Sequence, residues 1–103
     1  GYGYLGIADH SQTAFYANGL TADRIAQQHR DMDKLAEKMP GFRLYKGIES
    51  DILADGSLDY SDEILGSFDY IVGSIHQPMN MHADEMTQRI LNAIRNPKCT
   101  MLG

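Results

Sequence analysis

Three largely apolar runs constrain the fold most strongly, because each leads into a residue that can bind a divalent metal ion. The runs are residues 4–8 before His10, residues 42–48 before Glu49, and residues 68–75 before His76. Runs without a polar stripe are typical of strands that are covered on both faces, as in a parallel sheet. The sequence therefore predicts three strands that each end at a potential metal ligand, and residues 4–8 and 68–75 have the pattern of covered strands.

Two longer segments between these runs have the periodicity of amphipathic helices. The first helix is predicted over about 21–39, with Thr21 as its N-cap and Pro40-Gly41 as its end. Leu20 and Ile25 are placed as the two halves of a hydrophobic staple. The second helix is predicted to follow His82 and to end before Pro97. The predicted buried faces are Ile25, Met32, Leu35, Ala36 and Met39 in the first helix, and Ala83, Met86, Ile90, Ala93 and Ile94 in the second.

Smaller elements complete the alternation of strands and helices. Residues 54–57 form a turn signal, Ser61 is a predicted cap of a short helix, and a fourth strand begins near Thr100. An order of strand, helix, strand, short helix, strand, helix, strand predicts an α/β fold of parallel βαβ units with right-handed crossovers. The carboxyl ends of parallel strands meet at one edge, where ligands collect in such folds. His10, Glu49 and His76 are therefore expected to lie together.

The outer strands of this sheet would be apolar and unpaired, which is an aggregation hazard in a free protein. We therefore expect the 103 residues to be one domain at most, and a fragment of a larger α/β barrel.

Composition narrows the function classes. The net charge of −5 does not favour a surface that mainly neutralises phosphates, and the basic residues of the first helix alternate with acids as on a solvated face. Cys99 is the single cysteine, so no disulfide can form within the chain, and a buried inert thiol is expected. The absence of a long apolar span or a signal segment favours the cytoplasm and no membrane partner.

Imidazole nitrogen and carboxylate oxygen suit zinc, manganese or iron, and a carboxylate can also bridge two ions. A set of His10, Glu49 and His76 fits a multinuclear site that holds a phosphate and activates water. Spacing alone does not establish this, because no two of the three residues share a compact motif. On spacing alone, purely structural roles for His10, Glu49 and His76 are open alternatives.

Two acidic residues, Asp9 and Asp51, are candidates for contacting the metal ligands and orienting them without binding the metal themselves. Asp9 adjoins His10, although neighbouring strand residues point to opposite faces, so that an ion pair or a cap is an equal alternative. Asp51 has the same parity as Glu49 and could reach the site, but the favoured interpretation is a structural acid that opens a loop. His29 is expected on a helix surface and His82 at a helix start.

Other catalytic motifs are absent from the sequence. Ser11 and Ser50 lie near candidate ligands, but neither is the nucleophile of a glycine-flanked elbow. There is no P-loop, and the glycines of residues 1–6 lack the strand and helix that a dinucleotide fingerprint requires. No organic cofactor is predicted.

The three motifs together resemble the polymerase and histidinol phosphatase (PHP) family. They are LGIADHS at 5–11, KGIESDIL at 46–53 and IVGSIH at 71–76. The segments at 52–60 and 68–70 are most similar to the PHP domain of bacterial family X DNA polymerases. The resemblance covers nearly all of the chain.

This resemblance implies a distorted barrel of seven strand-helix units, (β/α)7, with up to three metal ions at its rim. It implies that His10 binds one ion, that Glu49 is the catalytic carboxylate bridging two others, and that His76 binds one of that pair. The implied activity is that of a metal-dependent phosphoesterase, with a DNA 3′ end as substrate and manganese favoured among manganese, zinc and iron. A small-molecule phosphatase of the histidinol phosphatase kind and a non-catalytic structural module are the alternatives.

The sequence also departs from the family pattern. No His-x-His motif precedes His10, and the glycine-histidine and Asp-x-His motifs expected after Thr100 are not present in residues 1–103. We therefore expect residues 1–103 to be a partial PHP domain that lacks the first strand and the C-terminal units. The isolated piece is expected to be inactive and to hold metal weakly unless the remaining barrel segments complete it; its oligomeric state is not predicted.

Overall fold

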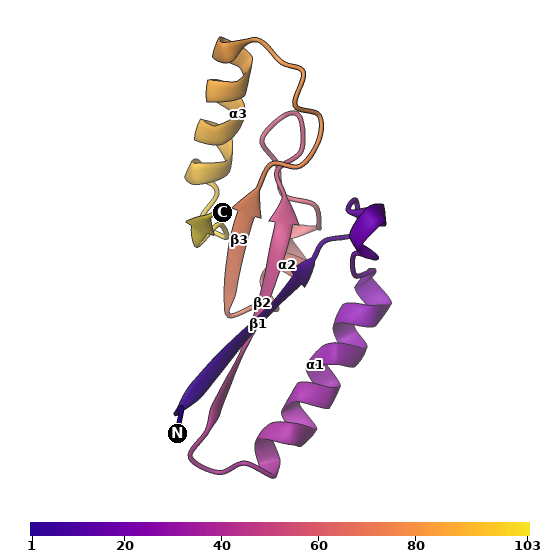
Figure 1. The fold of residues 1–103 in the computed structure, drawn as a ribbon, viewed down its shortest axis with the longest axis vertical. Coiled ribbons are helices and arrows are strands. Elements are labelled where there is room, and N and C mark those ends of the chain that lie inside the picture. The colour runs from indigo at the N-terminus through magenta and orange to yellow at the C-terminus, as the bar shows by residue number, and fades with distance from the viewer.

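The computed structural model describes residues 1–103 and contains one parallel sheet with helices in its connections. The elements in chain order are β1 (Tyr4–His10), η1 (Phe15–Ala17), α1 (Ala22–Glu37), β2 (Arg43–Asp51), α2 (Asp62–Leu65), β3 (Tyr70–Ser74), α3 (Ala83–Arg95) and β4 (Met101–Leu102). The strand order is β1-β2-β3-β4, and every neighbouring pair is parallel (Figure 1). The predicted α/β class with parallel βαβ units is confirmed.

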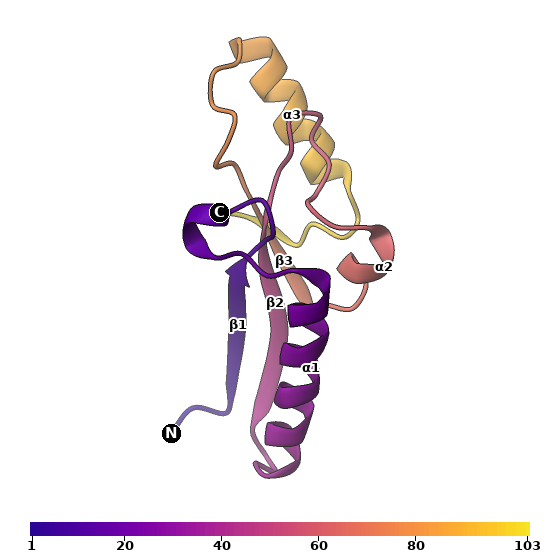
Figure 2. The ribbon, with the colours of Figure 1, turned by 90° about the vertical axis from the view of Figure 1, so that its right-hand side faces the viewer.

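The helices pack on one side of the sheet, where they share a core with it. Figure 2 shows α1 and α2 beside β2 and β3, with α3 farther along the molecule. Nine buried residues form this core: Leu20, Ile25, Ile48, Ile52, Leu58, Tyr60, Leu65, Ile71 and Ala93. They come from the sheet, from all three helices and from their connections, so the helix layer and the sheet stabilise each other by apolar burial.

Local capping explains where the helices begin. The Thr21 hydroxyl accepts the N–H of Arg24 at 3.4 Å, and the Ser61 hydroxyl accepts the N–H of Ile64 at 3.4 Å. The predicted turn at 54–57 is also present, with Gly56 at φ +89°. A side chain on Gly56 would meet the Arg89 carbonyl of α3 at 2.6 Å, so the turn needs glycine there.

The covering of both faces that is predicted for the first strand is not present within residues 1–103, which agrees with the expectation that the outer strands would be unpaired. β1 is an edge strand that pairs only with β2, and Tyr4 and Leu5 are 69% and 52% exposed. Apolar side chains alone do not decide burial, because burial depends on what packs against the strand.

The predicted buried faces of the two long helices include more residues than the structure buries. In α1 only Ile25 and Met32 are buried, whereas Leu35 is exposed near the end of the helix. In α3 the buried residues are Arg89 and Ala93, and Ile94 is 53% exposed. A buried arginine therefore joins α3 to the connections that follow β2 and β3, and Ala93 adds an apolar contact with the core.

Two smaller expectations have mixed outcomes. Cys99 is free and half-buried, and it packs against the core rather than lying fully inside it. No helix combines the length and the apolar character that crossing a membrane requires.

Candidate metal centre

The sheet brings His10, Glu49 and His76 together at one edge. His10 is the last residue of β1 and is the register partner of Glu49 in β2. His76 lies two residues beyond the end of β3, the next strand. One ligand atom from each of the three residues lies within 4.8 Å of the others. Glu49 lies inside β2, which continues to Asp51, rather than just after the strand as predicted.

The geometry of this cluster fits a divalent ion. The Nε2 atom of His76 lies 3.1 Å from the Oε1 atom of Glu49, and the Nδ1 atom of His10 lies 3.9 Å from the same oxygen. The His10 Nδ1 atom is buried and has no hydrogen-bond partner. Buried polar atoms without a partner are rare and costly, so this nitrogen is suited to a ligand that the cluster would hold. The donor set of two imidazoles and a carboxylate matches the preferences of zinc, manganese and iron.

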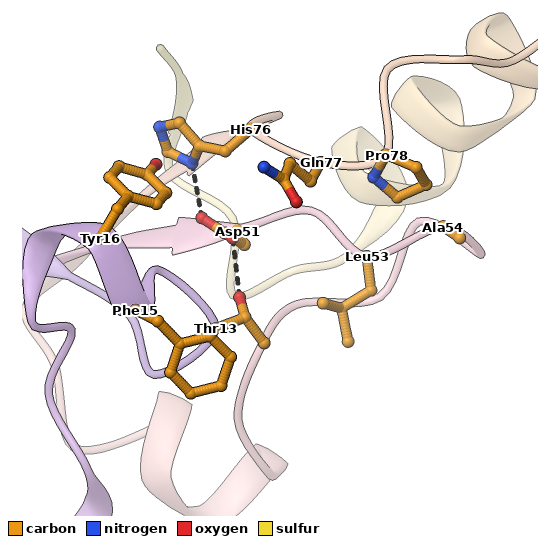
Figure 3. Close-up of a pocket in the computed structure, with 9 residues that line it drawn as sticks. All are labelled: Thr13, Phe15, Tyr16, Asp51, Leu53, Ala54, His76, Gln77 and Pro78. Atoms are coloured by element: carbon orange, nitrogen blue, oxygen red, sulfur yellow. Dashed lines mark hydrogen bonds and ion pairs between the residues drawn. The ribbon is translucent and has the colours of Figure 1, made fainter.

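Asp51 reaches the site, contrary to the favoured interpretation of it as a structural acid. Its Oδ1 atom lies 2.5 Å from the Nδ1 atom of His76, on the ring edge opposite to Glu49. Figure 3 shows Asp51 between His76 and Thr13, with a contact to each. A carboxylate that holds the second nitrogen of a histidine fixes the ring orientation, which is the arrangement found behind many metal ligands.

Asp9 lies elsewhere. Its carboxylate accepts a hydrogen bond from the Gln28 side chain of α1 at 2.7 Å, and no hydrogen bond joins it to His10. The alternation of side chains along β1 places Asp9 and His10 on opposite faces of the strand. Of the two acidic candidates, the structure brings only Asp51 to the histidines.

Tyr16 stands over both histidines from η1. Its ring centroid lies 6.1 Å from those of His10 and His76, and both contacts are edge-on. Partial desolvation, with the negative charges of Asp51 and Glu49 adding to it, raises the pKa of Tyr16 above its ordinary value of 10.0. Its hydroxyl is therefore a neutral donor at physiological pH.

A pocket of about 500 Å³ opens beside this cluster (Figure 3). It is lined by Thr13, Phe15, Tyr16, Asp51, Leu53, Ala54, His76, Gln77 and Pro78. Apolar and polar groups share its wall, as is usual for a site that orients a small ligand.

Sequence reasoning missed three residues around the site: Thr13, Tyr16 and Asp59. Thr13 and Tyr16 come from the connection between β1 and α1, and the buried Asp59 comes from the connection between β2 and α2. Loop residues follow no hydrophobic periodicity, so only their polar or aromatic character could have drawn attention to them.

The other two histidines lie outside the cluster. His29 is half-buried on α1, with its ring centroid 5.0 Å from that of Phe68, and burial lowers its pKa. His82 is the exposed N-cap residue of α3 and makes no capping hydrogen bond through its side chain. Both positions agree with the structural roles expected for them.

Similarity to known proteins supports the family resemblance. The DNA polymerase/3′-5′ exonuclease PolX of Bacillus subtilis (strain 168) is 44% identical over 96 residues, which are 93% of this chain and 17% of that protein. The resemblance to the PHP domain of family X polymerases is confirmed. A probable phosphatase of Thermoanaerobacter sp. (strain X514) is 34% identical over 73 residues, 67% of this PHP-like chain and 30% of that protein.

A probable phosphatase of Clostridium acetobutylicum is 33% identical over 78 residues, 71% of this PHP-like chain and 31% of that protein. The PHP-like chain thus spans less than a third of the length of each of these relatives. No family model matches it.

Proposed function

We propose that the protein is a metal-dependent phosphoesterase, a hydrolase of phosphate esters. The observation that carries the proposal is the convergence of His10, Glu49 and His76 within 4.8 Å at one sheet edge. Relatives named as an exonuclease and as probable phosphatases support the same reaction class, since both kinds of enzyme cleave phosphate esters.

Glu49 is the proposed catalytic and bridging carboxylate, with His10 and His76 as further metal ligands. When bound, divalent ions supply charge neutralisation at the phosphate and lower the pKa of water toward neutrality. Manganese, zinc and iron all suit these donors. Glu49 lies nearest the centre of the cluster, 3.1 Å from one imidazole and 3.9 Å from the other, which supports its bridging role.

The residues around the ligands have separate tasks in this proposal. Asp51 holds His76 from behind through the Nδ1 atom. Tyr16 keeps its proton, so its hydroxyl can donate to an anionic phosphate oxygen at the mouth of the pocket. The half-exposed side chains of Glu49 and His10 leave the cluster accessible to a substrate from solvent.

The proposed substrate is a phosphodiester, and specifically a DNA 3′ end. Phe15 and Tyr16 are 87% and 67% exposed beside the pocket, and exposed aromatic rings are platforms for stacking bases of single strands. The polymerase relative is named as a 3′-5′ exonuclease, which agrees with this substrate. The second candidate is a small-molecule phosphatase, which the probable phosphatases favour.

Residues 1–103 are proposed to be part of a larger PHP domain. Three protein donors cannot complete the coordination of several ions, because each zinc-like ion takes three or four protein ligands. The remaining barrel segments are therefore the first proposed partner, and the isolated residues are proposed to be inactive. The cytoplasm is the proposed compartment, and a structural module without catalysis is the remaining alternative.

The proposal is tested with the full-length protein that contains these residues, supplied with Mn²⁺. A 3′-labelled single-stranded oligonucleotide is the diester probe, p-nitrophenyl phosphate is the monoester probe, and a Glu49→Gln preparation controls for contaminating nucleases. Hydrolysis of the oligonucleotide by wild type but not by Glu49→Gln supports the exonuclease proposal. Hydrolysis of only the monoester favours the phosphatase, and no hydrolysis of either by metal-loaded protein contradicts the enzyme.

A further inference from the structure

A chain of hydrogen bonds runs from His76 through Asp51 to Thr13, along the wall of the pocket beside the cluster. Asp51 is 4% exposed and contacts His76 Nδ1 with Oδ1 at 2.5 Å. Its second oxygen, Oδ2, accepts from the Thr13 hydroxyl at 2.7 Å. Both carboxylate oxygens therefore have a partner, which a buried charge requires. The partners come from two other parts of the chain, the connection after β1 and the residues after β3.

The ring of His76 lies between two carboxylates, with Nδ1 facing Asp51 at 2.5 Å and Nε2 facing Glu49 at 3.1 Å. A neutral imidazole carries one N–H, and the other nitrogen is an acceptor. With the single proton on Nδ1, hydrogen-bonded to Asp51, the lone pair of Nε2 would be directed toward Glu49, 3.1 Å away. This tautomer is the one in which His76 can act as a ligand together with Glu49.

Thr13 has one hydroxyl hydrogen and two carboxylates within reach. Its Oγ1 atom lies 2.7 Å from Asp51 Oδ2 and 2.9 Å from Asp59 Oδ2. Asp59 already accepts the backbone N–H of Thr13 at 2.8 Å. The hydroxyl hydrogen is thus available to Asp51, and the N–H serves Asp59.

Asp59 in turn fixes the backbone around Thr13. It is 5% exposed, its carbonyl accepts from the Gln12 side chain at 2.6 Å, and its N–H donates to the Ser50 hydroxyl at 3.0 Å. The connection after β1 is therefore joined to the connection after β2 at several points. The loop that carries Tyr16 over the histidines also carries the hydroxyl that holds Asp51.

We propose that Asp51 and Thr13 are positioning residues that hold His76 in its Nδ1-protonated tautomer, with Asp59 anchoring Thr13. The inference rests on the proposed metal centre for its purpose, but its geometry is independent of any reaction. Neither residue is one of the three clustered ligands, although both line the pocket beside them. Both act through His76.

The test reads the tautomer and the metal separately in the full-length protein. Long-range ¹H–¹⁵N spectra of the metal-free, ¹⁵N-histidine-labelled protein identify the protonated nitrogen of His76. Zinc affinity is measured by competition with a chromophoric chelator. The variants are Asp51→Asn, Thr13→Val and Thr13→Ser, and Thr87→Val on the exposed surface of α3 is the matched control.

The expected wild-type spectrum has a hydrogen-bonded proton on Nδ1 of His76. Asp51→Asn is expected to alter that resonance and to weaken zinc binding about 10–100-fold. Thr13→Val should alter the same resonance and weaken zinc binding by a smaller factor, whereas Thr13→Ser and Thr87→Val should resemble wild type. Failure of serine to rescue would mean that the threonine methyl group, not the hydroxyl, matters.

A His76 that carries no proton on Nδ1 in wild type overturns the inference. So does a His76 resonance or a zinc affinity that stays unchanged in Asp51→Asn. If the spectra and affinities follow the expectation but the loaded protein hydrolyses no ester, only the proposed function fails. If wild type binds no zinc, the spectra alone still decide the role of Asp51 and Thr13.

Discussion

His10 and Glu49 are register partners on the neighbouring parallel strands β1 and β2, with His10 Nδ1 3.9 Å from Glu49 Oε1. Paired residues of adjacent strands present their side chains to the same face, so the strand register itself brings an imidazole and a carboxylate together. A shift of this register by one residue would turn one of the two away. The cluster of His10, Glu49 and His76 therefore depends on the pairing of β1 with β2.

Replacing Glu49 with glutamine removes the only carboxylate of the cluster while keeping its shape. We predict loss of hydrolysis, because the neutral amide cannot bridge cations, and a change of no more than about 1 kcal/mol in unfolding free energy. Turnover and urea denaturation measure the two effects. Unchanged turnover in Glu49→Gln would refute the role assigned to this residue.

Arg89 is predicted to be the largest single contributor to stability outside the apolar core. It is 1% exposed, and its guanidinium donates to the backbone carbonyls of Ile52, Leu53, Gln77 and Pro78. Replacement by methionine removes the donor from all four carbonyls, of which the Leu53 carbonyl keeps a second donor, the N–H of Gly56 at 2.8 Å. We expect a loss of about 3 kcal/mol or more in unfolding free energy, because each unsatisfied buried group costs roughly 1–3 kcal/mol.

The matched control is Arg95→Met, an exposed arginine of the same helix. The expected loss of unfolding free energy in Arg95→Met is about 1 kcal/mol or less. This loss comes from the favourable interaction of Arg95 with the C-terminal end of the helix dipole. Both variants are compared with wild type by urea denaturation. Equal losses in the two variants would show that the buried contacts of Arg89 contribute nothing specific.

Gly47 is predicted to be irreplaceable by alanine. An added Cβ atom would lie 2.2 Å from Cζ of the Tyr70 ring and 2.6 Å from the carbonyl oxygen of Ile7. The ring or the β1–β2 pairing must then shift, with a loss of about 1–3 kcal/mol. Gly3→Ala is the control, since nothing lies within 4 Å of its added Cβ. Thermal denaturation should give a lower melting temperature for Gly47→Ala than for Gly3→Ala. Equal melting temperatures would contradict the close packing described for Gly47.

His29 is predicted to make the fold less stable in mild acid. Burial, and secondly the positive charge of Lys46, lowers its pKa from 6.5 in the folded chain, so below pH 6.5 the unfolded chain binds a proton that the folded chain does not. Unfolding free energy should therefore fall as pH falls from 6.5 toward the lowered pKa. His29→Gln should flatten this part of the profile in urea denaturation. A profile identical to that of wild type would exclude His29 as the cause.

The order of elements could be predicted from the sequence because it depends on local signals. The apolar runs, the caps Thr21 and Ser61, and the break at Pro40 each act over a few residues. The convergence of His10 with Glu49 and His76 followed from one topological rule about parallel strands, since helices cannot intervene at the sheet edge.

What could not be predicted depends on contacts between distant loops. Asp51 reaches His76, rather than opening a loop, because β2 continues past Glu49 and keeps both carboxylates on one face. Arg89 is buried because backbone carbonyls accept hydrogen bonds from its guanidinium. Every residue has such a carbonyl, so the sequence does not indicate which of them will meet an arginine. Thr13 and Asp59 meet only once two connections have folded against each other.

Metal content tests the central claim most directly. The full-length protein is dialysed against Mn²⁺, then against metal-free buffer, and the bound ion is measured by elemental analysis. We predict at least one bound ion per chain in wild type and in the exposed-site control His82→Gln, and a lower content in the double variant His10→Gln/His76→Gln. Less than one ion per chain in wild type would contradict a metal centre at His10, Glu49 and His76.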